Sequence, residues 1–146
     1  MTHETSFQSR LKAQLPLSIG DYMAMCNEHY YASRDPLGAD GDFTTAPEIS
    51  QMFGELIGMW IADYWIKLGE PTSLTLLECG AGRGTLMADI LRTFKFVPGL
   101  SEAVQVVLLE TSKSLIQKQK NTLQQFEIKH ISSIREFGGE GPVIII

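Results

Sequence analysis

Apolar side chains recur at steps of three and four residues between positions 47 and 68, which is the spacing of an amphipathic helix. A proline opens this run and suits the first turn of a helix, while Gly69 and Pro71 end it. Gly54 and Gly58 lie four residues apart, so their missing side chains predict a close crossing by a second helix. The apolar positions are Ile49, Met52, Phe53, Leu56, Ile57, Trp60, Ile61, Tyr64 and Leu68.

The chain before this helix predicts a shorter helix and then a long loop. Ser18 can cap a helix that runs to about His29 and carries Asp21 in its first turn. Residues 30–45 contain Pro36 and two glycines among small polar residues, which is typical of a loop. Loops of such length in compact domains are mostly functional or disordered.

Beyond residue 71 the pattern changes to short apolar runs that alternate with helical segments. Strands that are apolar throughout and alternate with helices predict a parallel sheet covered on both faces, so the fold class is α/β. The last run reaches Ile146 without a following loop, and we therefore expect a truncated product or a fragment of a longer protein. Strands are predicted at 74–77, 104–109, 128–131 and 143–146, and helices at 85–94 and 112–126.

Composition and charge narrow the classes of function. The chain is 44% hydrophobic, enough for a packed core, and its formal charge of −5 gives no general attraction to nucleic acid or anionic lipid. The sequence holds no apolar run of membrane-spanning length and no secretory leader pattern. Cys26 and Cys79 lie outside any CxxC spacing, which argues against a disulfide scaffold or a zinc site. We expect a soluble protein with no nucleic-acid, membrane or metal partner.

Glycines at positions 80, 82 and 84 join the first predicted strand to its helix. In doubly wound folds this connection holds a nucleotide-like ligand. A dinucleotide fingerprint would need glycine where Thr85 stands, and a phosphate-binding loop would need a lysine before the Ser or Thr. Both spacings fail, which disfavours a nucleotide-dependent oxidoreductase. A tight turn without any ligand is the other alternative.

The same glycines, preceded by Glu78, resemble the first motif of class I methyltransferases, whose cofactor is S-adenosylmethionine. In that resemblance Glu78 lies near the methionine end of the cofactor. Glu110, at the end of the second strand, would accept hydrogen bonds from both ribose hydroxyls; a solvated residue at a strand end is its alternative. The resemblance implies a cofactor site of Glu78, Gly80, Ala81, Gly82, Gly84, Thr85 and Glu110.

The segment from Tyr30 to Gln51 resembles the MidA-like methyltransferases, a family that includes the mitochondrial assembly factor of respiratory complex I. The resemblance continues through residues 52–58 and 80–91. It implies a Rossmann-like class I methyltransferase fold. Residues 1–70 would form an N-terminal helical and substrate-loop region, and residues 71–146 the first, truncated part of the cofactor-binding domain.

This family resemblance also implies a protein substrate, with an arginine of a complex I subunit as the acceptor in the mitochondrial member. A guanidinium is almost always protonated, so carboxylates must orient it in a dry pocket. Asp42 and Glu48 are the candidate catalytic carboxylates; their alternatives are a turn-forming residue and a helix-start residue. Aromatic rings could contact the guanidinium or the sulfonium. The candidate pocket residues are Tyr30, Tyr31, Phe43, Thr44 and Thr45.

Some positions depart from the family pattern. Cys79 and Ala81 stand where Leu and Pro are usual, and the Asn-Glu-Phe-Phe-Asp segment that follows the fourth strand in the family is absent. That absence argues against catalysis by this chain alone. The second hypothesis is therefore a catalytically incomplete remnant that keeps a partner-binding surface on the 47–68 helix. The expected location is the cytoplasm in a bacterium and the mitochondrial matrix in a eukaryote.

Overall fold

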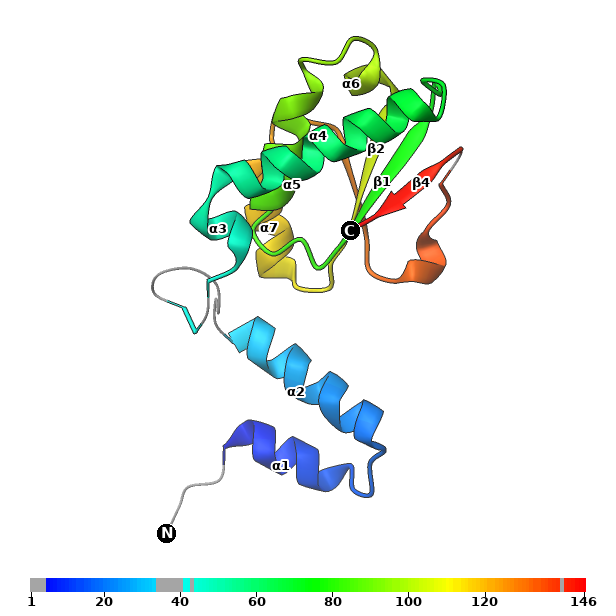
Figure 1. The fold of residues 1–146 in the computed structure, drawn as a ribbon. Coiled ribbons are helices and arrows are strands. Elements are labelled where there is room, and N and C mark those ends of the chain that lie inside the picture. The colour runs from blue at the N-terminus through cyan, green and yellow to red at the C-terminus, as the bar shows by residue number, and fades with distance from the viewer. Residues whose placement is uncertain (1–4, 34–40, 43, 140) are drawn as a thin grey trace. The chain divides into compact units, whose positions relative to one another are not determined.

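The computed structural model describes residues 5–33, 41–42, 44–139 and 141–146, and the chain divides after residue 36 into two compact units (Figure 1). The first unit contains α1 (Ser6–Ala13) and α2 (Ile19–Ser33). A capping box starts α1, because the Thr5 and Gln8 side chains each accept a hydrogen bond from the other residue's backbone N–H. The Phe7 and His29 rings stack at 4.1 Å between centroids and join the two helices. Helix α1 was not predicted, although its capping pattern is visible in the sequence.

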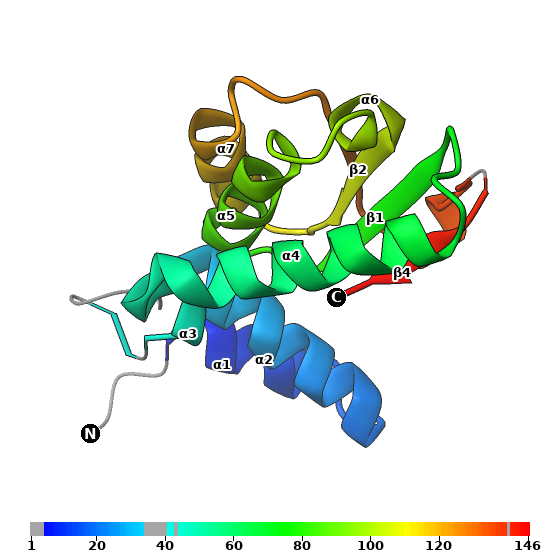
Figure 2. The same ribbon diagram turned by 45° about the horizontal axis from the view of Figure 1, so that its top comes forward.

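The second unit begins with α3 (Ala46–Ile49) and α4 (Gln51–Lys67). The single helix predicted over 47–68 is therefore wrong in one respect: Ser50 adopts an extended conformation, with φ −149° and ψ 121°, and separates two helices. The predicted close crossing is confirmed. A Cβ at Gly54 would lie 2.5 Å from the Cβ of Asp89, and one at Gly58 would lie 2.9 Å from the carbonyl oxygen of Ile90. Figures 1 and 2 show α4 beside α5 (Thr85–Phe94).

Four parallel strands form the sheet in the order β3-β2-β1-β4, which confirms the α/β fold class. The chain moves outward from β1 to β2 and β3 and then returns to the other side of β1, so strand order reverses next to β1. In open α/β sheets, ligands bind at such a reversal, outside the carboxyl ends of the strands. The strands are β1 (Leu74–Cys79), β2 (Val104–Leu109), β3 (Ile128–Ile131) and β4 (Val143–Ile145).

The remaining elements are α6 (Leu100–Ala103), α7 (Lys113–Thr122) and the short 3-10 helix η1 (Ile134–Glu136). The observed β1 is two residues longer than predicted, because Glu78 and Cys79 pair with Leu108 and Leu109 of β2. Pairing between strands thus extends β1 past the apolar run. The helix predicted over 112–126 ends four residues early, at Thr122, and α2 continues past His29 to Ser33.

The core packs unequally on the two faces of the sheet, where sequence analysis predicted cover on both. The larger cluster joins one face to α4 and α5, with Ile61, Trp65, Leu76, Ile90 and Phe94 buried in it. On the other face Leu77, Val107 and Ile131 form a smaller cluster against Leu109 and Phe137.

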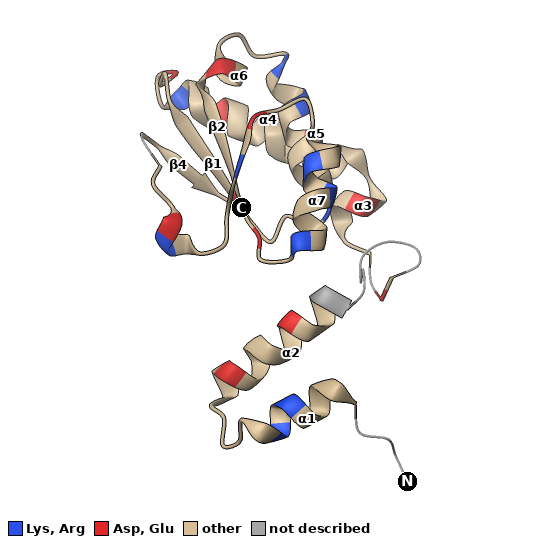
Figure 3. Cartoon of the chain, turned by 180° about the vertical axis from the view of Figure 1, so that it is seen from behind, with Lys and Arg blue, Asp and Glu red and all other residues tan. Residues whose placement is uncertain are grey.

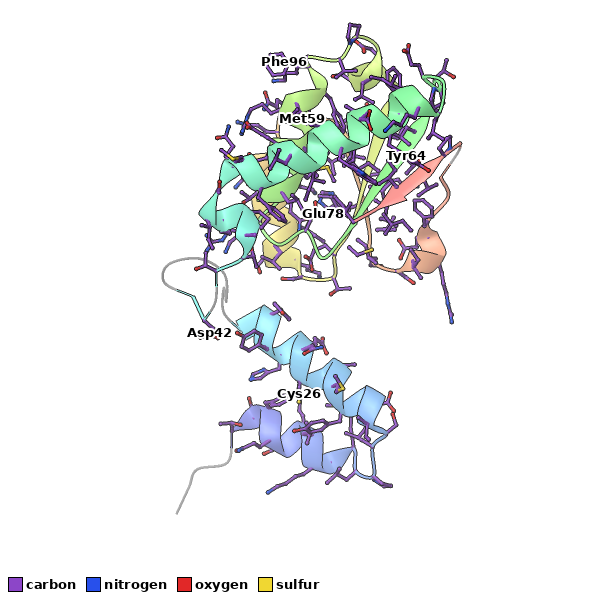
Figure 4. The ribbon with its side chains drawn as sticks, in the orientation of Figure 1. Cys26, Asp42, Met59, Tyr64, Glu78 and Phe96 are labelled. Carbon is purple, nitrogen blue, oxygen red and sulfur yellow. The ribbon has the colours of Figure 1, made fainter. Side chains whose placement is uncertain are left out.

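Several apolar side chains lie outside the core on α4, including Met59 at 61% and Tyr64 at 43% exposure (Figure 4). Acidic and basic segments are interspersed over the second unit (Figure 3). Within the described ranges, no helix is both long and apolar enough to cross a membrane. The same residues contain no cluster of three or more His, Cys, Asp or Glu side chains that could hold a metal ion.

Candidate cofactor site at the carboxyl ends of the strands

The connection from β1 to α5 takes a backbone path that glycine adopts readily. Gly80, Gly82 and Gly84 have φ values of 76°, 54° and 82°, in the left-handed region that side chains disfavour. The Gly80 N–H donates to the carbonyl of Leu109 at 3.0 Å, which ties this loop to the end of β2. A Cβ at Gly80 would meet no atom within 4 Å, whereas one at Gly84 would lie 3.2 Å from Leu123. Gly80 therefore faces open space, and Gly84 permits packing against α7.

Helix α5 begins at this loop without a side-chain cap. Its N-cap residue is Gly84, which has no side chain to accept a bond from the first turn. Free N–H groups at a helix start can bind an anion or another acceptor. The first turn of α5 therefore has no side-chain acceptor from its N-cap residue.

Glu78 lies on β1 and is only 5% exposed (Figure 4). Among the described residues, no hydrogen-bond partner reaches its Oε2 atom. Burial raises the pKa of this carboxyl from 4.5 to about 7, because water no longer solvates the charged form. A buried carboxylate needs a cation, a donor or a proton. Glu78 is thus a buried acid whose charged form is not compensated by a partner on Oε2 among the described residues.

Glu110 follows β2 and is 9% exposed, but its carboxylate has several partners. Oε1 accepts from the backbone N–H groups of Thr111 at 2.8 Å and Ser112 at 2.9 Å, and Oε2 accepts from Gln119 at 3.3 Å. A carboxylate has roughly four acceptor positions, so about one stays open, on Oε2. Gln119 also donates to the carbonyl of Gly82 at 2.9 Å, which places Glu110 beside the glycine loop. Acceptance from both ribose hydroxyls would need one more position, and it stays a prediction.

Glu48 lies on α3 and reaches the start of α5. Its Oε1 accepts from the Thr85 hydroxyl at 2.7 Å, and its Oε2 lies 3.6 Å from Arg83 Nη1. These contacts bring a candidate catalytic carboxylate to the cofactor loop across 37 positions of sequence. The same contacts also fit the alternative that Glu48 favours the start of a helix. That helix would be α5 as well as α3, the helix on which Glu48 lies.

The other predicted pocket residues are distributed over both units. Tyr30 and Tyr31 lie on α2, with their rings edge to face at 5.1 Å between centroids. Asp42 precedes α3 in the chain, and its side chain is exposed (Figure 4). The Thr45 carbonyl accepts from the Glu48 N–H at 2.9 Å, and Thr44 comes directly before it in the chain. Phe43 lies outside the described residues. A shared pocket stays a prediction.

Three residues of this region were not predicted as site residues: Gln119, His130 and Arg83. A signal for Gln119 was present, because it lies midway between Leu115 and Leu123 at steps of four residues on α7. A polar residue inside an apolar helix stripe needs a buried partner. Neither His130 nor Arg83 carries a comparable local signal.

These features define an α/β protein with a candidate ligand site beside β1, and comparison with known proteins defines its family. A family model described as "Putative S-adenosyl-L-methionine-dependent methyltransferase" matches residues 56–145. The chain belongs to this family, and S-adenosylmethionine is the cofactor of the class.

Individual relatives agree with this assignment. The zebrafish protein arginine methyltransferase NDUFAF7, mitochondrial, is 43% identical over 121 residues, covering 79% of this chain and 29% of the relative. The human protein of the same name is 40% identical over 125 residues, covering 82% and 28%. The chain therefore spans less than a third of these relatives. A Burkholderia thailandensis structure bound to S-adenosyl-homocysteine has a TM-score of 0.71 at 23% identity, covering 95% of this chain and 40% of that one, which shows the same fold.

Proposed function

We propose that this chain supplies the S-adenosylmethionine site of a protein arginine methyltransferase. The observation that carries the proposal is the buried Glu78 carboxylate, whose Oε2 has no partner among the described residues. It lies two positions before Gly80, where a Cβ would meet nothing within 4 Å. An acid without a cation, beside an open loop and the uncapped start of α5, fits a ligand that carries an ammonium and a carboxylate on one carbon.

Different residues of the site bind different parts of the cofactor. Glu78 binds the ammonium, and the backbone from Gly80 to Gly82, with Ala81 between them, lies against the carboxylate and ribose. Gly84 and Thr85 orient the start of α5. Glu110 receives a ribose hydroxyl on Oε2. When bound, the cofactor supplies a methyl group on a positively charged sulfur, which an acceptor nitrogen can displace.

The substrate side of the proposal depends on Glu48. Its carboxylate is already beside the cofactor loop and already faces a guanidinium, because Arg83 Nη1 lies 3.6 Å from Oε2. A substrate arginine could take this place, since guanidinium and carboxylate groups pair in two-point fashion. Asp42 is the second orienting carboxylate, and Thr44 and Thr45, which follow it in the second unit, would line the substrate pocket.

The names of the relatives support a class of methyl acceptor and a cellular location. They are named protein arginine methyltransferases and mitochondrial, which supports a protein acceptor and, for a eukaryotic chain, the matrix. The family resemblance adds an arginine of a respiratory complex I subunit as acceptor. In this proposal residues 1–70 form the helical and substrate-loop region and residues 71–146 the first part of the cofactor-binding domain. The alternative is a catalytically incomplete chain that retains the fold.

Calorimetry with S-adenosylmethionine and S-adenosyl-homocysteine tests the cofactor site. We expect saturable binding of both ligands by the 146-residue chain and none of NADH. Glu78→Gln should weaken binding, while Glu102→Gln, an exposed residue of α6, should leave it unchanged. Absence of binding at millimolar ligand would overturn the proposal.

A second assay separates the active enzyme from the incomplete alternative. Radiolabelled S-adenosylmethionine is incubated with the chain and a candidate complex I subunit, and label on arginine is measured. Transfer by the 146-residue chain would refute the incomplete alternative. Binding without transfer would support that alternative and leave the cofactor site intact.

A further inference from the structure

Gln119 is buried on the helix that packs against the cofactor loop. Gln119 is 0% exposed, and it lies on the same side of α7 as the buried residues Leu115 and Leu123. Burial of a carboxamide is unfavourable unless its N–H and C=O groups find partners. Leucine would suit this position if packing alone mattered, so the partners of Gln119 indicate what the residue does.

The carboxamide has a partner for every polar atom. Its Nε2 donates to the Gly82 carbonyl at 2.9 Å and to Glu110 Oε2 at 3.3 Å, and its Oε1 lies 3.0 Å from His130 Nε2. The carbonyl and the carboxylate can only accept, so both N–H groups of Gln119 must point to them. His130 must then donate through Nε2. The partners fix which way the amide faces.

His130 can fill this role as a neutral ring. It is half-buried on β3, and burial, followed by the positive charge of Lys120, lowers its pKa below the usual value. A neutral imidazole carries one N–H, and the bond to Gln119 places it on Nε2. The β3 strand thereby fixes the orientation of a side chain on α7.

The Gln119 side chain therefore connects α7 to three other segments of the second unit. The Gly82 carbonyl belongs to the loop after β1, Glu110 follows β2, His130 is on β3, and Gln119 comes from α7. The two groups that receive its N–H groups are both members of the proposed cofactor site. Without Gln119, the Glu110 carboxylate would keep only the two backbone donors on Oε1.

We propose that Gln119 is the positioning residue of the cofactor site, which holds the Glu110 carboxylate in register with the Gly82 loop. The inference rests on the proposed function, because it assigns Gln119 a role in ligand binding. Gln119 does not touch the ligand. It keeps Glu110 Oε2 turned toward the glycine loop and leaves one acceptor position there for a ribose hydroxyl.

A double-mutant cycle tests this role with S-adenosyl-homocysteine as the probe, measured by calorimetry on the 146-residue chain. Gln119→Met keeps the length of the side chain and removes its hydrogen bonds. We expect this change to weaken binding about tenfold in the wild-type background, and about twofold or less when Glu110 is already alanine. Gln117→Met, an exposed glutamine on the same helix, is the matched control and should change nothing.

A role in packing alone would weaken binding equally in both backgrounds, and that result would overturn the proposal. In a second cycle the ligand is changed and Glu110 is kept. The 2′,3′-dideoxy analogue of the probe, which lacks both ribose hydroxyls, replaces the Glu110→Ala substitution. Gln119→Met should then affect the probe and spare the analogue. If circular dichroism shows that Gln119→Met does not fold, His130→Leu replaces it in both cycles, with an expected loss of about threefold.

Failure of the proposed function gives a different result. If the wild-type chain does not bind S-adenosyl-homocysteine, the cofactor site itself is wrong and Gln119 has nothing to position. If the wild type binds and Glu110→Ala weakens binding, but the cycle is additive, only the role of Gln119 is wrong.

Discussion

The ends of β1 and β2 each carry a buried glutamate, and the two carboxylates are in opposite conditions. Glu110 accepts three hydrogen bonds, from two backbone N–H groups and from Gln119. Glu78 has an Oε2 atom with no partner among the described residues, and burial raises its pKa to about 7. The folded chain therefore supplies hydrogen-bond donors to Glu110 and, among the described residues, none to Oε2 of Glu78. This difference underlies the proposed roles, in which Glu110 receives a neutral hydroxyl and Glu78 an ammonium.

Removal of Glu110 should produce the largest effect. Glu110→Ala leaves three donors without their acceptor, and each unsatisfied buried group costs about 1–3 kcal/mol. We expect the free energy of unfolding to fall by about 4 kcal/mol and cofactor binding to weaken by at least about 100-fold. Urea denaturation and calorimetry measure the two quantities. Unchanged binding in a folded variant would remove Glu110 from the site.

The pH dependence of stability tests the contrasting state of Glu78. The pKa of Glu78 is about 7 in the folded chain against 4.5 for the free side chain, so the folded state holds a proton that the unfolded state has lost between these values. The folded chain should therefore lose stability as pH rises from 4.5 to about 7, by about 3 kcal/mol from this group.

The comparison with Glu78→Gln isolates this contribution from other titrating groups. Denaturation curves of both proteins are recorded from pH 4.5 to 8. The difference between them should grow in favour of the variant as pH rises, while Glu102→Gln should follow the wild type. A parallel pair of curves for wild type and Glu78→Gln would show that Glu78 is solvated or paired in the folded chain.

Cofactor binding should respond to Glu78 in the opposite sense. The ionised carboxylate binds an ammonium, so the affinity of the wild type should rise with pH through about 7, where Glu78 loses its proton. At pH 8 we expect Glu78→Gln to bind about 30-fold more weakly, since hydrogen bonds to charged groups contribute about 1.5–3 kcal/mol. The variant should also lose most of the pH dependence. Equal affinities at pH 8 would place the ammonium elsewhere.

The sequence allowed prediction of the α/β class and the close α4–α5 crossing, because both depend on local apolar spacing and on missing side chains. The apolar pattern did not predict the break at Ser50, because apolar residues continue on both sides of this extended residue. It also missed the Gln119 network, which joins residues from four segments. Such networks depend on tertiary packing, and only the buried glutamine among leucines gave a local signal. The positions of Glu78 and Glu110 in the chain were predictable, but their different partners were not.

The smallest expected effect concerns the link between Glu48 and the cofactor loop. Thr85→Val removes the 2.7 Å hydrogen bond to Glu48 Oε1 at little change in volume. A single side-chain hydrogen bond of this kind contributes about 1 kcal/mol to the free energy of unfolding. We expect that loss in urea denaturation, with Thr122→Val, an exposed residue at the end of α7, as the matched control.

The same variant distinguishes the two interpretations of Glu48. If Glu48 serves only to favour the start of α5, cofactor binding should fall together with stability. If Glu48 is a substrate carboxylate, Thr85→Val should leave cofactor affinity within about twofold and lower methyl transfer to arginine, because the carboxylate then keeps Arg83 but loses the hydrogen bond that orients Oε1. Glu48 would then differ from both Glu78 and Glu110 in acting on the substrate arginine, with the Thr85 hydroxyl holding it in place.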